Sequence, residues 1–107
     1  MQNNTDTFDK ESIIYFIKCF DGTQYTFLNG CCYWFCHILN TRFGGITFYE
    51  SIDSHFVQKI GDAFYDVRGD VTDIYKDRQS LIRWDTLESI DSTRYKRIID
   101  CCVTMVR

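Results

Sequence analysis

Apolar residues recur at intervals of three and four in three stretches of the chain, the spacing that places them on one face of an α-helix. The first stretch predicts a helix that begins near Thr7 or Asp9 and stops at Asp21-Gly22. The second predicts a helix from about residue 31 or 32 to just before Gly44-Gly45, and the third predicts one from about Ser92. The side chains expected to face the core are Ile13, Phe16, Ile17 and Phe20, then Phe35, Ile38 and Leu39, and finally Tyr95, Ile98, Ile99, Cys102 and Met105.

Between the second and third helices, three short runs carry β-branched and aromatic residues, which favours strands. Gly61-Asp62 separates the last two runs and predicts a tight hairpin. Helices at both ends of a small antiparallel sheet of about three strands indicate an α+β fold. The predicted strands are Ile46–Glu50, His55–Ile60 and Ala63–Val67.

The remaining segments predict local features. Residues 23–28 favour a short extended piece that ends in a turn at 29–30. The charged stretch 70–78 is expected to be a solvated loop, and Asp85-x-x-Glu88 has the pattern of a capping box for a short helix.

Composition favours one folded domain over residues 1–107, with residues 1–6 disordered. The net charge of −3 provides no cluster of Lys and Arg for a phosphate backbone, so no direct nucleic-acid binding is expected. No run approaches the roughly 18 apolar residues of a membrane span. The six cysteines include two adjacent pairs, which suit disulfide geometry poorly, so we expect reduced thiols in the cytosol.

Three residues together predict a thiol site. Cys32 falls in the first turn of a predicted helix, where free N–H groups and the helix dipole favour a thiolate. A two-residue turn at Gly61-Asp62 pairs Ile60 with Ala63 and places His55 and Asp66 diagonally on one face of the hairpin. Cys32 would then act as nucleophile, His55 as its base and Asp66 as the group that orients the base.

This order of elements resembles that of papain-like thiol hydrolases. Cys32-Tyr33-Trp34-Phe35 is similar to the start of their central helix, and residues 54–57 and 65–69 resemble their His and carboxylate strands. The resemblance implies an upstream amide for the oxyanion hole. Gln24 and Asn29 are the candidates, at spacings that differ from the papain-like pattern.

Across its whole length, the chain more closely resembles a family of small proteins from phages and mobile elements of Gram-positive bacteria. The resemblance rests on Gly30-Cys31-Cys32-Tyr33-Trp34-Phe35 and on the ending Arg97-Ile98-Ile99-Asp100-Cys101-Cys102. It implies no activity of its own. It does favour an alternative function, a stoichiometric inhibitor or adaptor that binds a host protein.

Plainer interpretations of the same residues stay open at this point. Free Cys often behaves as a small core hydrophobe, and Asp66 could simply pair with Arg68. Cys31, Cys32, Cys36 and His37 include thiolate and imidazole ligands suited to zinc, but they lack a matching second pair in a turn, so no metal and no cofactor are expected.

A surplus of aromatic residues between positions 33 and 65 predicts some aromatic surface, since so small a domain is not expected to enclose them all. Tyr33 and Trp34 are the candidate anchors for a partner. The sequence leaves the oligomeric state open.

Overall fold

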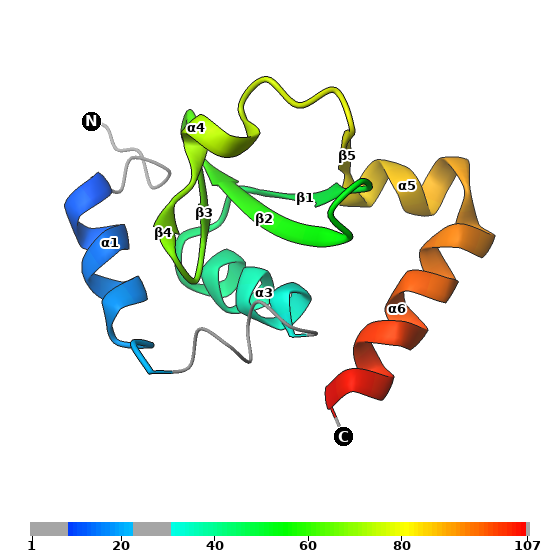
Figure 1. Cartoon of the computed structure of the whole chain (residues 1–107), viewed down its shortest axis with the longest axis horizontal. Coiled ribbons are helices and arrows are strands. Elements are labelled where there is room, and N and C mark those ends of the chain that lie inside the picture. The colour runs from blue at the N-terminus through cyan, green and yellow to red at the C-terminus, as the bar shows by residue number, and fades with distance from the viewer. Residues whose placement is uncertain (1–8, 23–30, 107) are drawn as a thin grey trace.

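The computed structural model describes residues 9–22 and 31–106, with side chains up to residue 101. The expected disorder of residues 1–6, the extended piece at 23–28 and the turn at 29–30 lie outside these residues. A central antiparallel sheet has helix α3 on one face and α4 on the other (Figure 1). This mixed architecture confirms the α+β prediction.

The sheet has five strands in the order β4-β3-β2-β1-β5, and each strand is antiparallel to its neighbours. The three predicted strands form its centre, with β3 one residue shorter than predicted. The two edge strands were not predicted because, at two and three residues, they are too short to show alternation. The strands are β1 (Ile46–Glu50), β2 (His55–Ile60), β3 (Ala63–Asp66), β4 (Gly69–Asp70) and β5 (Leu81–Arg83).

The helices follow the apolar spacing closely. Asp9 caps the first one, because its carboxylate accepts a hydrogen bond from the Ser12 N–H at 2.8 Å. The predicted capping box at Asp85 is wrong: the helix begins one residue earlier, and Asp85 pairs with Arg83 instead. The helices are α1 (Lys10–Lys18), α3 (Cys32–Phe43), α4 (Thr72–Tyr75), α5 (Trp84–Ile90) and α6 (Ser92–Val106).

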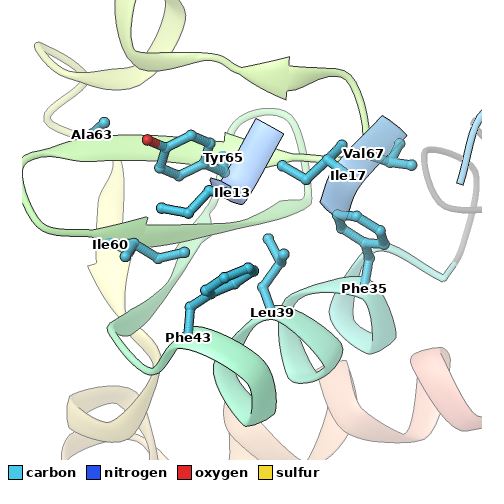
Figure 2. Close-up of a cluster of buried hydrophobic side chains, with 9 residues drawn as sticks. All are labelled: Ile13, Ile17, Phe35, Leu39, Phe43, Ile60, Ala63, Tyr65 and Val67. Atoms are coloured by element: carbon cyan, nitrogen blue, oxygen red, sulfur yellow. The ribbon is translucent and has the colours of Figure 1, made fainter. Parts of the chain in front are cut away.

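One core cluster joins α1, α3 and the α3-facing side of β2 and β3 (Figure 2). Phe35, Leu39 and Phe43 follow one another at four-residue intervals along α3, so they share the face that meets the sheet. Leu39 is fully buried, and truncating such a side chain to Ala typically costs about 2–5 kcal/mol of stability. The other members of the cluster are Ile13, Ile17, Ile60, Ala63, Tyr65 and Val67.

A second cluster forms where α5 and α6 meet the N-terminal half of α3. Tyr95, Ile98 and Ile99 of α6 pack against it, as the apolar spacing predicted. Cys102 and Met105, the remaining residues of that predicted stripe, lie beyond the described side chains. The buried members of the cluster are Cys32, Cys36, Tyr49, Phe56, Trp84 and Leu87.

One prediction about exposure is wrong. Residues 70–78 are not simply a solvated loop, because β4 and α4 lie there and Val71 and Tyr75 are buried. The expectation that the aromatic residues between 33 and 65 are not all enclosed is confirmed in part, because Tyr33, Trp34 and Phe48 are half-buried but none of these residues is exposed. The others are buried: Phe35, Phe43, Tyr49, Phe56, Phe64 and Tyr65.

Candidate thiol site

The three predicted site residues lie at one end of the sheet. His55 begins β2 and Asp66 ends β3, so both lie opposite the Gly61-Asp62 hairpin. The Ile60–Ala63 pairing expected from a two-residue turn is confirmed.

Helix α3 runs in the same direction as β2, which brings Cys32 to the same end as His55. The C-terminal end of α3 is fixed near the hairpin, because Gln58 Nε2 donates a hydrogen bond to the Gly44 carbonyl at 2.9 Å. Gly45 approaches the strand so closely that a Cβ there would lie 2.2 Å from the Lys59 carbonyl oxygen, and its φ is +101°. Only glycine fits this junction. The opposite end of α3, which begins at Cys32, therefore lies beside the start of β2.

His55 and Asp66 are buried and directly bonded. Nε2 of His55 lies 2.8 Å from Oδ2 of Asp66, and the two residues are only 6% and 2% exposed. The prediction that they share a hydrogen bond is confirmed. With Nε2 held by Asp66, Nδ1 is the ring nitrogen left for the thiol, because imidazole has only two.

Asp66 also accepts hydrogen bonds from Arg68, the alternative partner that the sequence analysis considered. The Arg68 backbone N–H donates to Oδ1 at 2.8 Å, and its guanidinium Nη2 lies 2.6 Å from Oδ2. Burial disfavours the carboxylate charge, but the hydrogen bonds from His55 and Arg68 hold the pKa of Asp66 below its ordinary value. Asp66 is therefore an anion over the physiological pH range.

The Cys32 thiol lies near enough to His55 to influence the charge of its imidazole. Burial opposes a positive charge on the ring, but the hydrogen bond to Asp66 and the nearby Cys32 outweigh it and raise the pKa of His55 to about 9. The ring is therefore an imidazolium at neutral pH.

The start of α3 places the positive end of a helix dipole beside Cys32. Its N-cap residue, Cys31, makes no side-chain hydrogen bond to the first turn, and that turn contains no acidic residue. No charge or cap of the helix itself therefore offsets the positive end of the helix dipole beside Cys32.

The other described cysteines are placed differently along the chain. Cys36, one turn further along α3, is 1% exposed, and burial raises the pKa of its thiol well above the ordinary value. Cys19 and Cys101 are exposed, and Cys31 is half-buried. Within the described residues, no three His, Cys, Asp or Glu side chains gather in a way that could hold a metal ion.

The candidates for the oxyanion hole and for partner binding do not join the Cys32, His55 and Asp66 group among the described residues. Gln24 and Asn29 lie outside the described residues. Tyr33 packs edge-on against Phe56 at 5.1 Å, so its ring lies at the rim of the second core cluster. The Trp34 ring meets the Tyr33 ring edge-on at 5.2 Å. Nε1 of Trp34 is enclosed without a hydrogen-bond partner.

Sequence reasoning missed Tyr75, whose ring stacks on the His55 imidazole with centroids 6.0 Å apart and planes 28° apart. The available signal was the four-residue interval between Val71 and Tyr75, which suggests one turn of helix with a buried face.

Comparison with known proteins now adds one finding. A family model described as Phage YunG-like protein matches residues 2–98. The chain belongs to the Phage YunG-like family. This match confirms the resemblance to small phage proteins. No curated protein and no solved structure is detectably similar to the chain. Among the described residues, no helix is long and apolar enough to cross a membrane.

Proposed function

We propose that this Phage YunG-like protein is a papain-like thiol hydrolase that cleaves an amide or ester bond. The observation that carries the proposal is the buried chain of contacts from Asp66 through His55 to Cys32 at the N-terminal end of α3. An anion, an imidazolium and a thiol in this order match the roles of orienter, base and nucleophile in thiol catalysis.

In the proposed reaction, the Cys32 thiolate attacks the substrate carbonyl carbon and forms a C–S bond. The C–N or C–O bond to the leaving group then breaks, and His55 gives its proton to the departing amine or alcohol. Water next attacks the thioester while His55 takes up a proton from it. The C–S bond then breaks, the carboxylic acid leaves, and the Cys32 thiolate and the His55 imidazolium are restored.

The backbone N–H of Cys32 supports this reaction as a donor to the oxyanion. N–H groups of the first helical turn have no partner within the helix, so they are available to a developing negative charge.

The test compares Cys32 with Cys36, which lies on the same helix and is also buried. We expect p-nitrophenyl acetate to give a burst of nitrophenol with an acetyl group trapped on Cys32, as mapped by mass spectrometry. Cys32→Ala should lower the rate by orders of magnitude while the fold persists, and Cys36→Ala should keep the burst. A burst unchanged by Cys32→Ala, or no burst from the folded wild type, contradicts the proposal.

Brief alkylation with iodoacetamide at pH 6 provides a second readout. Cys32 should react faster than the exposed Cys19 and Cys101, since a cationic His55 favours the reactive thiolate whereas exposure alone does not. Equal or slower labelling of Cys32 counts against an activated thiol.

One observation favours a second candidate, a stoichiometric inhibitor or adaptor that acts on a host protein in the host cytosol. Cys32 is only 8% exposed, which suits a packed residue as well as a nucleophile. In this alternative, Cys32→Ala keeps the biological effect in a host assay, because binding energy comes from interface anchors rather than from one sulfur. A folded Cys32→Ala protein that loses the effect rejects the adaptor.

A further inference from the structure

The residues behind the thiol site form a continuous polar network. Arg68 bonds Asp66 through Nε as well as Nη2, and Nη2 also lies 3.4 Å from the Tyr75 hydroxyl. That hydroxyl in turn lies 3.5 Å from Oδ2 of Asp53. Tyr75 therefore touches the site twice, with its ring on His55 and its hydroxyl on Arg68.

We propose that Arg68 and Tyr75 are positioning residues that set the orientation and the proton affinity of His55. This inference rests on the proposed function for its catalytic meaning, but its physical content stands on the contacts of His55 and Asp66. Arg68 shares the carboxylate that His55 uses, and Tyr75 supports the imidazole from its face.

The charges explain why a second cation is useful here. Asp66 alone, buried next to His55, would bind the imidazolium so firmly that the ring could not exchange a proton readily. Arg68 places a positive charge on the same carboxylate, so part of the attraction of Asp66 is directed away from the ring. A histidine that must give and take a proton in each turnover needs such a balance.

Every element around His55 contributes a group to this balance. Helix α3 provides the Cys32 thiol, β3 and the turn after it provide Asp66 and Arg68, and α4 provides the Tyr75 phenol. Glu50 of β1 lies opposite His55 in the register, and Asp53 precedes it in the β1–β2 loop. Both of those carboxylates are engaged by Arg78, so Arg68 is the cation that acts on the carboxylate bound to His55.

Titration of the wild type and of folded single variants by NMR tests the proposal. His55 and His37 are the two histidines of the chain, and His37 is exposed on α3, so its signal serves as an internal reference. Arg68→Gln should raise the His55 midpoint by about one pH unit, because a cation near the imidazolium is lost. Arg68→Lys should restore most of the wild-type value, since it keeps the charge.

Tyr75→Phe should raise the His55 midpoint less than Arg68→Gln does, because it keeps the stacked ring and removes only the hydroxyl that orients Arg68. Arg83→Gln is the matched control: Arg83 pairs with Asp85 on the edge strand, and its loss should leave the His55 midpoint unchanged.

Three results overturn the proposal. In Arg68→Gln, the His55 midpoint stays or falls while the His37 midpoint and the amide spectrum are preserved. Arg68→Lys shifts the His55 midpoint as far as Arg68→Gln does, which means that the shift comes from altered packing and not from the lost charge. In Tyr75→Phe, the His55 midpoint stays at the wild-type value, which excludes Tyr75 as a positioning residue. If the shifts occur as expected but wild-type protein gives no acetyl-Cys32, the positioning network stands and the hydrolase proposal fails.

Discussion

Two buried carboxylates, Glu50 and Asp66, solve the same physical problem in nearly the same way. Each is the last residue of its strand, and the two are 0% and 2% exposed. Each accepts a hydrogen bond from a backbone N–H just beyond the strand, Glu50 from Asp53 at 2.5 Å and Asp66 from Arg68 at 2.8 Å. Each also meets an arginine, Arg78 for Glu50 and Arg68 for Asp66. Such partners are what a buried charge requires.

The two sites differ in their last partner. Glu50 accepts a hydrogen bond from the Ser80 hydroxyl, which links β1 to the segment before β5. Among the hydrogen bonds of the described residues, Ser80 contacts no titratable group other than Glu50. Asp66 accepts from His55, which passes the interaction on to Cys32. Burial of a carboxylate is therefore no mark of function. What distinguishes Asp66 is that its partner can change its own charge and lies near the Cys32 thiol.

The largest expected effect comes from neutralising each carboxylate. Asp66→Asn and Glu50→Gln should each lower the free energy of unfolding in urea by about 2 kcal/mol, because each weakens the hydrogen bonds that a buried carboxylate accepts. Only Asp66→Asn should lower the pKa of His55, by removing an opposite charge, and slow iodoacetamide labelling of Cys32 at pH 6. If Glu50→Gln slows the labelling of Cys32 as much as Asp66→Asn does, then Asp66 has no special link to Cys32 and the two carboxylate sites do not differ in this respect.

The pH dependence of stability separates the sites next. Burial alone would raise the pKa of Glu50, but the hydrogen bond from Ser80 outweighs it and lowers the pKa. The contribution of Glu50 to stability is therefore lost only in acid. The pKa of His55 is raised to about 9, so its contribution is complete below its unfolded value near 6.5 and declines as the pH rises toward 9. Between pH 6 and pH 8, the titration of His55 alone should lower the free energy of unfolding by about 2 kcal/mol.

His55→Gln should remove this alkaline decline, and urea unfolding at pH 6 and pH 8 measures it. The comparison stops at pH 8 because the raised pKa of the Cys36 thiol adds a further loss of stability at higher pH. In Cys32→Ala, no thiolate can offset the titration of His55, so this variant should also lose stability as the pH rises, and a constant stability of the variant over this interval contradicts the charged state assigned to His55.

The helices, the central hairpin and the His55–Asp66 bond could be predicted because they follow from local rules. Strand alternation and a two-residue turn at Gly61-Asp62 determine which side chains share a face, whatever surrounds them. The start of α3 followed in the same way from apolar spacing, which placed Cys32 in the first turn.

The rest depends on contacts between distant segments. The pairing of edge strands β4 and β5 depends on the chain around them, and α4 is a single turn whose spacing can suggest a buried face but not the residues that this face meets. Tyr75 therefore could not be placed on His55, and Ser80 could not be placed on Glu50, from their neighbours in sequence. The alternatives for Asp66 also stayed open because one carboxylate can accept from Arg68 and His55 together.

The smallest expected effect concerns the loop that links the two carboxylate sites. Ser54 lies between Asp53, which donates its N–H to Glu50, and His55, which binds Asp66, and its φ is +53°. A side chain in this left-handed region costs about 1 kcal/mol, because Cβ approaches the following carbonyl oxygen. Ser54→Gly relieves that cost but gives the unfolded chain more freedom. The variant should therefore raise the free energy of unfolding by about 0.5 kcal/mol in urea denaturation, with the His55 midpoint unchanged. A destabilised variant whose His55 midpoint also moves would show that the serine side chain itself holds the two sites in register.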